Sequence, residues 1–321
     1  MKQAYPIEIQ APDISAWEHS NTAVPYVWSF DSGRSGPHVM VQALTHGNEF
    51  CGAIAVDWLL RQGVKPNVGR LTIAFANTLA YSRWDPEQPS ASRYVDEDFN
   101  RVWGDDVLFG SRDSAELRRA RLLQPFVDAA DYLLDIHSMS EPCAPIMVCG
   151  ATGQGGEKSA ALSKRVGLPE VLLIDTGHPA GLRMIERGGF GKPDDPRTGL
   201  LIECGQHWEK SAADVANDTL LRFLRLFNIV DDAFVQPALR LPVCTKQRVV
   251  RVTEAVVAQS TGFRFNKEYK GLEVISKKGV VVANDGDTTI RAPYDNTVLV
   301  MPSTSNVKVG STTVRFGQFE D

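Results

Sequence analysis

The stretch HVMVQALTHGNE, residues 38–49, decides how this chain folds and where its chemistry lies. Residues 38–44 form a mostly apolar run, which is typical of a strand covered by helices on both faces. A helical pattern follows Glu49, and His46 and Glu49 stand three residues apart where the strand gives way to it. Both side chains can therefore turn toward one point beyond the end of the strand, where open α/β sheets place their sites.

A second apolar run, residues 132–136, leads directly into His137. If the two runs are neighbouring strands of one sheet, His46, Glu49 and His137 meet above their carboxyl ends. Two imidazoles and one carboxylate form the ligand set of a catalytic zinc site that keeps its fourth position open for water. We therefore predict one zinc ion per chain. The alternative is that His46 is a loop histidine bound to a backbone carbonyl and that the macrodipole favours Glu49 at a helix start.

The composition is that of an ordinary globular protein. The 321 residues carry a formal net charge of -5, so nucleic acid is not expected as a partner. No apolar run approaches the roughly 20 residues that a membrane-spanning helix needs, and no secretory signal is visible at the N-terminus. Five cysteines without a C-x-x-C pair indicate reduced thiols, and we expect a cytoplasmic protein. The oligomeric state stays open, a homo-oligomer included.

Two regions of different pattern divide the chain. From about residue 24 to 230, short apolar runs alternate with helical stretches, which predicts a three-layer α/β domain. The expected strands cover residues 24–30, 38–44, 70–76, 132–136, 146–149, 171–174 and 200–204. The expected helices cover residues 117–130, after Asp113 and Glu116, and 215–228, after Ser211 and Asp214. We place this domain at residues 1–235.

Residues 236–321 form the second region, which we expect to be a smaller all-β domain. Its β-rich runs are short and separated by Gly, Asn and Asp, and they cover residues 248–252, 272–275, 280–283, 297–301 and 312–316. The rhythm of strands and turns resembles that of biotinyl/lipoyl-like barrel sandwiches. The carrier lysine of such domains is missing, so a structural or site-covering role is expected.

A polar cluster lies between the second and third predicted metal ligands, in residues 92–103. Arg93, Asn100 and Arg101 stand there among few helix or strand signals. Arginine offers a rigid fork that matches a carboxylate, and a neighbouring asparagine adds an amide to the same oxygens. The alternative is a surface loop whose arginines and aspartates pair with one another, with little gain in stability.

Four motifs occur in an order that resembles the aspartoacylase/succinylglutamate desuccinylase family, a branch of the zinc carboxypeptidase superfamily. They are His46-Gly47-Asn48-Glu49, the R-x-x-D-x-D-x-N-R run from Arg93 to Arg101, Asp135-Ile136-His137, and Ile202-Glu203. The resemblance covers nearly the whole chain and implies a zinc-carboxypeptidase-like fold with a mixed sheet. It assigns His46, Glu49 and His137 to zinc.

The resemblance also implies roles for the remaining polar residues. Glu203 matches the catalytic glutamate, and a carboxylate there can take a proton from the zinc-activated water. Arg93 matches the arginine that polarises the scissile carbonyl. Asn100 and Arg101 match the pair that binds the substrate carboxylate. The alternative for Glu203 is a carboxylate at the sheet end that caps a helix or pairs with Arg197.

The sequence departs from the family at two positions that read the substrate. The aspartoacylase branch has a further arginine before the catalytic glutamate, and Arg183, Arg187 and Arg197 are all candidates here, with Arg197 the nearest. The branch also uses a tyrosine of the C-terminal domain, for which Tyr294 is a candidate by region. His178 and His207 stand near the expected mouth of the site.

We therefore predict a zinc-dependent amidohydrolase that removes the acyl group from an N-acyl amino acid or a close analogue. Such an enzyme hydrolyses carbon–nitrogen bonds of linear amides other than peptides. A metallocarboxypeptidase or peptide amidase with the same zinc ligands is the first alternative. A non-catalytic binding protein of the same fold is the second, although such a protein has no need of a carboxylate at Glu203. The acyl group and the amino acid stay open.

Overall fold

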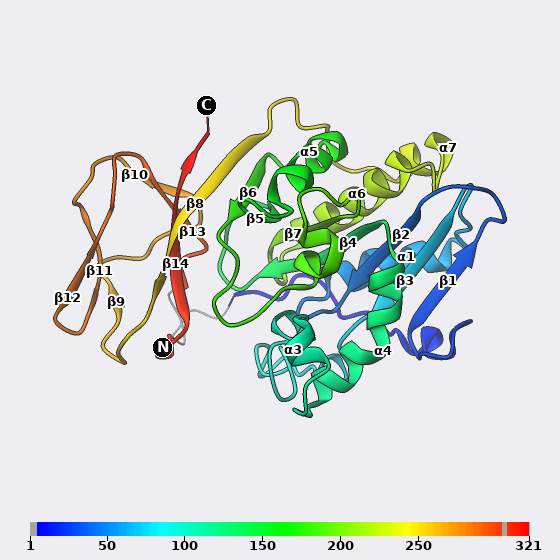
Figure 1. The fold of residues 1–321 in the computed structure, drawn as a ribbon, viewed down its shortest axis with the longest axis horizontal. Helices are drawn as coiled ribbons and strands as arrows, with labels where there is room; N and C mark the ends of the chain where they lie inside the picture. The colour runs from blue at the N-terminus through cyan, green and yellow to red at the C-terminus, as the bar shows by residue number, and fades with distance from the viewer. Residues whose placement is uncertain (1–4, 304–306, 321) are drawn as a thin grey trace.

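An eleven-stranded mixed sheet runs through the molecule and carries helices on both faces of its α/β part (Figure 1). The computed structural model describes residues 5–303 and 307–320. The strand order is β1-β3-β2-β4-β7-β5-β6-β8-β14-β13-β10, and β12-β11-β9 form a second, three-stranded sheet. The strands are β1 (Val27–Asp31), β2 (His38–Ala43), β3 (Arg70–Phe75), β4 (Tyr132–Met139), β5 (Ile146–Ala151), β6 (Val171–Asp175), β7 (Thr198–Gln206), β8 (Arg248–Val257), β9 (Arg264–Phe265), β10 (Glu273–Ile275), β11 (Val281–Asp285), β12 (Thr288–Arg291), β13 (Thr297–Val300) and β14 (Thr312–Phe319).

The helices cover both faces of this sheet because successive residues of its central strands, which point to opposite faces, are apolar. On β2, Val39 and Val41 belong to the core with α1 and α6, whereas Met40 belongs to the core with α4. The predicted three-layer α/β architecture is confirmed. The helices are α1 (Cys51–Arg61), α2 (Thr78–Tyr81), α3 (Asp105–Leu108), α4 (Ala115–Ala129), α5 (Gly156–Val166), α6 (Lys210–Leu226) and α7 (Asp232–Val235), and the 3-10 turns are η1 (Ser15–Trp17), η2 (Phe99–Arg101), η3 (Met184–Glu186), η4 (Gly188–Gly191) and η5 (Gln236–Ala238).

The starts of the two predicted long helices differ from expectation. Helix α4 begins at Ala115, and its N-cap is Ser114, whose hydroxyl accepts a hydrogen bond from the Leu117 amide at 3.0 Å. Asp113 instead forms a surface ion pair with Arg118. Helix α6 begins at Lys210, five residues before the apolar pattern, because its first turn is more polar than the rest.

Parallel pairing places the predicted ligand strands side by side at the centre of the sheet. Strand β2 pairs with β4 from Val39↔Tyr132 to Ala43↔Ile136. Strand β4 pairs in turn with β7, with His137 opposite Glu203. The carboxyl ends of all three strands therefore lie at one edge of the sheet, as parallel strands require.

The C-terminal strands continue the same sheet. Strand β8 pairs in parallel with β6 over Val171↔Arg248 to Ile174↔Arg251 and pairs antiparallel with β14 on its other side. Within the described part of residues 236–320, only a short 3-10 turn and strands follow α7, as the prediction of an all-β region requires. A small core that includes Ile275, Val282 and Phe316 lies between the two sheets of this region. The boundary after residue 235 stays a prediction.

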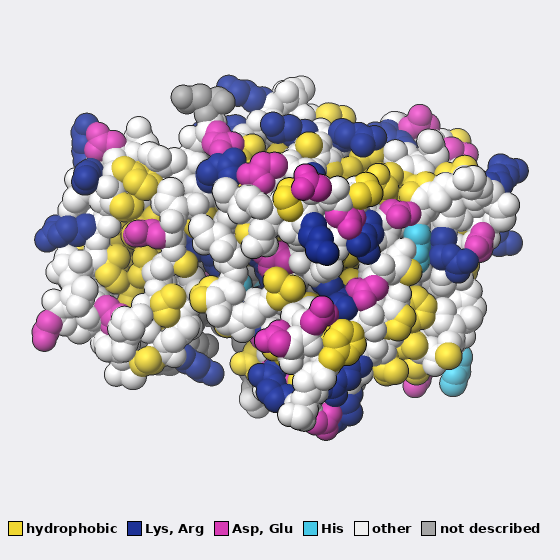
Figure 2. Space-filling model, in the orientation of Figure 1, with side chains coloured by type: hydrophobic (Ala, Val, Ile, Leu, Met, Phe, Trp, Pro, Cys, Tyr) yellow, Lys and Arg dark blue, Asp and Glu magenta, His cyan; other side chains and the backbone are white. Residues whose placement is uncertain are grey.

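Two surface properties bear on the expected partners. None of the helices in the described residues is long and apolar enough to cross a membrane. On the face shown in Figure 2, Lys and Arg side chains are interspersed with Asp and Glu rather than gathered in one basic patch.

Candidate metal centre and active site

His46, Glu49 and His137 converge at the carboxyl edge of the sheet. His46 Nδ1 lies 2.8 Å from Glu49 Oε1, and His137 Nδ1 lies 2.9 Å from Glu49 Oε2. One ligand atom from each of the three residues lies within 4.8 Å of the other two, and all three side chains are buried. The connection between β2 and α1 supplies the first two residues and β4 supplies the third. The structure thus brings together the three residues that the sequence singles out.

Each histidine also contacts a carboxylate with its other ring nitrogen. His46 Nε2 lies 2.9 Å from Asp98 Oδ1, and His137 Nε2 lies 2.8 Å from Asp135 Oδ2. The Thr45 hydroxyl donates a hydrogen bond of 2.7 Å to the other oxygen of Asp135. Carboxylates in this position orient metal-binding histidines and fix their tautomer. Both Nδ1 atoms are therefore directed to the common centre.

The donor set fits a zinc ion. The contact of His46 Nδ1 with Glu49 Oε1 at 2.8 Å lacks the geometry of a hydrogen bond, so this buried nitrogen has no hydrogen-bond partner among the described residues. Burial alone would raise the pKa of Glu49, but His46 and His137 hold it well below its usual value. Burial alone would lower the pKa of His137, but Asp135 and Glu49 hold it well above its usual value. The carboxylates thus favour positive charge at this centre, which a bound metal ion would supply in place of a proton.

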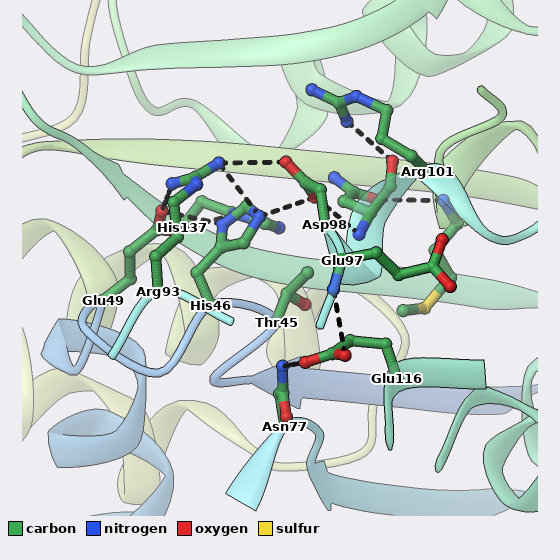
Figure 3. Close-up of polar contacts among 12 residues, drawn as sticks. Thr45, His46, Glu49, Asn77, Arg93, Glu97, Asp98, Arg101, Glu116 and His137 are labelled. Carbon is green, nitrogen blue, oxygen red and sulfur yellow. Dashed lines mark hydrogen bonds and ion pairs between the residues drawn. The ribbon is translucent and has the colours of Figure 1, made fainter. Parts of the chain in front are cut away.

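Arg93 reaches into the same cluster from the loop between β3 and α4. Its Nη1 donates to Glu49 Oε1 at 2.8 Å, and its Nη2 lies 3.4 Å from Asp98 Oδ2. Figure 3 shows the guanidinium beside Glu49 and His46, with Asp98 on its other side. With 36% of its side chain exposed, Arg93 is open to a molecule that enters the site.

Glu116 stabilises the conformation of the loop that carries Arg93. The carboxylate of this fully buried residue accepts hydrogen bonds from the successive amides of Val95, Asp96 and Glu97, at 2.7, 3.0 and 3.2 Å. It also accepts one from Asn77 Nδ2 at 2.9 Å, as drawn in Figure 3. Glu116 therefore fixes the segment that carries Arg93 at one end and Arg101 at the other. In the sequence it stands out only as a helix-start residue.

Replacing Glu116 with Gln is expected to destabilise the protein by ~2–4 kcal/mol. The amide keeps one acceptor oxygen but turns its NH₂ group toward backbone donors, and a buried donor without a partner costs about 1–3 kcal/mol. Urea unfolding of the variant measures the change. The control is Glu97→Gln, which removes only the partly exposed ion pair with Arg112 and should cost under ~1 kcal/mol. Equal stability of the two variants would contradict the role of Glu116.

Glu203 lies on β7 directly beside His137. Its Oε2 is buried and has no hydrogen-bond partner among the described residues. Burial raises the pKa of Glu203 to about 8, which Glu49 and Asp135 reinforce and which His137 and Arg93 oppose. A carboxylate whose pKa lies near neutrality is suited to accept and return a proton.

Asn100 and Arg101 belong to the turn η2, at the side of the cluster. Asn100 Oδ1 accepts a hydrogen bond from the Met184 amide at 3.1 Å, so its oxygen holds the fold together. Arg101 Nη1 donates to the Asn100 carbonyl at 2.6 Å and is the partner of no carboxylate in the described residues. The amide nitrogen of Asn100 and most of the Arg101 guanidinium are thus left for a ligand.

Arg197 and Tyr294 do not join the cluster. Arg197 precedes the first residue of β7, at the opposite end from Glu203, and pairs with Asp195 at 2.7 Å. The Tyr294 hydroxyl lies 2.7 Å from Thr253 Oγ1, within the C-terminal strands. The sequence separation of six residues between Arg197 and Glu203 is extended along a strand, which carries Arg197 away from the site.

His178 and His207 lie near the cluster and stay neutral. Burial, together with the charges of the neighbouring arginines, lowers the pKa of His178 to about 3. Burial likewise lowers the pKa of His207 to about 4, where its Nδ1 lies 2.9 Å from Ser138 Oγ.

Comparison with known families identifies the α/β part. The family described as the succinylglutamate desuccinylase/aspartoacylase catalytic domain matches residues 35–227. The chain belongs to this family. The family is one of deacylases. The matched residues include the cluster of His46, Glu49 and His137, and also Arg93, Arg101 and Glu203. No curated protein is significantly similar in sequence to the whole chain.

Several solved structures share the fold over nearly the whole chain. Succinylglutamate desuccinylase from Vibrio parahaemolyticus has 16% sequence identity and a TM-score of 0.66, with 92% of this chain and 87% of that one covered. An aspartoacylase family protein from Mesorhizobium loti has 19% identity and a TM-score of 0.62, with coverages of 92% and 89%. The ectoine utilization protein from Ruegeria pomeroyi, in a product-bound structure, has 14% identity and a TM-score of 0.62, with coverages of 94% and 93%. At these identities the likeness is one of fold.

Proposed function

We propose that this protein is a zinc-dependent deacylase that hydrolyses the amide bond of an N-acyl amino acid or a close analogue. The observation that carries the proposal is the placement of Glu203, with an unpartnered buried oxygen, opposite His137 in a cluster of two histidines and a carboxylate. A binding protein would not need that oxygen. Membership of a deacylase family supports the same reaction class.

His46, Glu49 and His137 would hold the zinc ion. Zinc there would lower the pKa of a water molecule toward about 7 and polarise the amide oxygen of the substrate. Glu203 takes the proton of the attacking water on Oε2 and returns it to the leaving amine. Its raised pKa supports this return, because a protonated carboxyl near neutral pH is a ready donor.

Arg93 would stabilise the negative charge that develops on the amide oxygen. Its guanidinium already lies in contact with Glu49, and it is held there by Asp98. Removing one such donor in other hydrolases costs about 3 kcal/mol of transition-state stabilisation. Arg101 and the amide of Asn100 would bind the carboxylate of the amino acid.

Zinc analysis combined with a substrate panel tests the proposal. The panel compares N-acetyl and N-succinyl amino acids with dipeptides that have a free C-terminus. Stoichiometric zinc and hydrolysis of the N-acyl amino acids are expected. Hydrolysis confined to the dipeptides would identify a metallocarboxypeptidase, and hydrolysis of neither class in the zinc-loaded protein would leave a binding protein.

The two arginines of the loop are expected to differ in what they recognise. Arg101→Ala should reduce kcat/KM for an N-acyl amino acid by about a hundredfold and slow its carboxyl ester far less, because only the acid presents the bidentate partner. Arg93→Ala should slow acid and ester alike, since the oxyanion is common to both. Steady-state kinetics of the matched acid and ester measure the difference. If wild-type protein hydrolyses both equally, the loop binds no carboxylate.

A further inference from the structure

Ser138 and His207 form a buried polar pair that the proposed reaction does not yet use. Ser138 follows His137 on β4, and His207 directly follows the last residue of β7. The Ser138 hydroxyl lies 2.9 Å from His207 Nδ1, and the two residues are only 3% and 2% exposed. Burying two polar side chains costs free energy, so we expect the pair to have a role besides packing.

A β-bulge beside Glu203 brings the pair together. From Glu203 to Gln206, β7 advances three residues while the paired residues of β4 advance two. Gly205 lies in this stretch with a φ of +118°, a conformation that favours glycine. Because side chains alternate between the two faces of a strand, the extra residue turns His207 to the face of Ser138. A regular strand would place His207 on the face of Glu203 instead.

The hydroxyl of Ser138 donates to His207 rather than accepting from it. Nδ1 of His207 is the only hydrogen-bond partner of Ser138 Oγ within the described part of the chain, and a buried hydroxyl hydrogen needs an acceptor. Burial keeps the imidazole neutral, since it lowers the pKa of His207 to about 4. A neutral ring that accepts at Nδ1 carries its proton on Nε2.

The Nε2–H group of His207 is a donor without a protein acceptor. Nε2 has no hydrogen-bond partner in residues 5–303 and 307–320, and the ring that carries it is buried. Buried donors in native proteins are almost always paired. This donor therefore indicates an acceptor that comes from a bound molecule.

The pair lies against the proposed metal centre. The Ser138 amide donates to Glu49 Oε2 at 3.3 Å, whereas Arg93 donates to Glu49 Oε1 at 2.8 Å. Arg93 and the Ser138–His207 pair thus approach the two oxygens of one carboxylate. The charges of Glu49 and Arg93 both act on the His207 ring, as its neighbours.

His207 and Arg101 lie toward opposite faces of the sheet. Trp208, next to His207, belongs to the core with α1 and α6, whereas Phe99, in the turn of Arg101, belongs to the core with α4. A substrate whose carboxylate is bound by Arg101 would cross the edge of the sheet at the metal centre. Its acyl group would then lie on the side of His207.

We propose that His207 is a further catalytic residue, whose Nε2–H donates a hydrogen bond to the acyl oxygen of the scissile amide as negative charge develops there. The inference rests on the proposed function for the reaction. Ser138 is a positioning residue, because its hydroxyl fixes the tautomer and the orientation of the ring. A donor held in place in a buried site gains strength as the oxygen becomes charged. Arg93 and His207 then stabilise the same oxygen.

Two amide substitutions separate the donor from the contact with Ser138. In His207→Asn, the amide oxygen can take the place of Nδ1 and accept from Ser138, but no donor remains at the place of Nε2. In His207→Gln, the amide nitrogen reaches the place of Nε2, and the contact with Ser138 is lost. His207→Asn should lower kcat for the best N-acetyl amino acid of the panel by about 10²- to 10³-fold, with KM within about threefold. His207→Gln should retain kcat within about tenfold of wild type.

A merely structural pair would respond in the reverse order, because His207→Asn keeps the contact with Ser138 and His207→Gln breaks it. Equal losses of kcat in the two variants, or a greater loss in His207→Gln, would therefore overturn the proposal. His19→Asn is the matched control, since it makes the same change at an exposed histidine outside the cluster. Its kcat and KM should equal those of wild type.

Binding of methylphosphonate distinguishes this inference from the proposed function, because binding needs no turnover. The tetrahedral anion resembles the species formed when water adds to an acetyl group. By isothermal titration calorimetry, zinc-loaded His207→Asn should bind it at least about tenfold more weakly than zinc-loaded wild type, and His207→Gln within about threefold. If no N-acyl amino acid is hydrolysed but this difference holds, the proposed function fails and the donor at His207 stands. Equal binding to wild type and His207→Asn, or no binding to wild type, overturns the assignment.

The tautomer of His207 can be measured in wild-type protein, so the inference stays testable even if the variants do not fold. Long-range ¹H–¹⁵N correlation spectra of protein with labelled histidine should show His207 with a proton on Nε2 and none on Nδ1. A proton on Nδ1 would overturn the proposal, because the ring would then have no donor for the substrate.

Discussion

Glu203→Gln is expected to reduce kcat by about 10²- to 10⁴-fold, which is the usual contribution of a general base. The amide keeps the size and shape of the side chain but cannot take a proton from the attacking water. Zinc content and folding should be unchanged, because Glu203 is not one of the three residues proposed to hold zinc. The measurement is stopped-flow or steady-state kinetics on the best substrate of the panel, with metal analysis of the same sample.

Asp195→Asn is the matched control for this variant. It changes a carboxylate to an amide just before β7, at the far end of the same strand, where Asp195 pairs with Arg197. Its kcat should stay close to that of the wild type. If Glu203→Gln also retains kcat within about tenfold, below the usual contribution of a base, Glu203 is structural and another group must move the proton.

Glu203→Gln should make the metal-free protein more stable, although it lowers kcat. The folded-state pKa of Glu203 is raised to about 8 by burial, so the folded protein binds a proton there more tightly than the unfolded chain does. Stability therefore falls as the pH rises from the unfolded pKa toward and through the folded one. Above pH 8, metal-free Glu203→Gln is expected to be more stable than metal-free wild type by ~2–4 kcal/mol. Greater stability with less activity would show that the carboxylate is kept for function.

His137→Ala is expected to abolish zinc binding and, with it, hydrolysis. Wild-type protein should carry about one zinc per chain, and loss of one of three protein ligands weakens binding by orders of magnitude. The fold should survive, because the side chain lies at the edge of a sheet whose core is built from β2, β4 and their covering helices. Metal analysis after gel filtration measures the loss, and circular dichroism reports on the fold.

His46→Ala should behave in the same way, since His46 offers the other imidazole. His19→Ala provides the control, because His19 is exposed and outside the cluster, and its zinc content should equal that of wild type. Stoichiometric zinc in both His46→Ala and His137→Ala would refute the ligand set.

The main strands of the α/β part and the meeting of His46, Glu49 and His137 could be anticipated because both follow from local pattern. Apolar runs such as residues 38–44 mark buried strands, and each candidate ligand follows directly after or within such a run. Parallel strands end at the same edge of a sheet, so residues that follow neighbouring strands can be expected to lie close together. The family motifs then narrow the choice of strands that lie side by side.

Residues that act across long separations could not be found in this way. Glu116 looks like an ordinary helix-start carboxylate, and its three amide partners lie about twenty residues earlier in a loop without pattern. Arg197 was favoured by its closeness to Glu203 in sequence, but six residues of extended strand span about 20 Å.

The hydrogen-bonded ladder between β6 and β8 has a consequence for the catalytic cycle. Swinging the C-terminal strands away from the α/β part would break backbone pairing at the four positions from Val171↔Arg248 to Ile174↔Arg251. The C-terminal strands are therefore expected to move together with the α/β part. For the deacylase proposed above, substrate entry and product release are then expected to proceed without a hinge at this ladder.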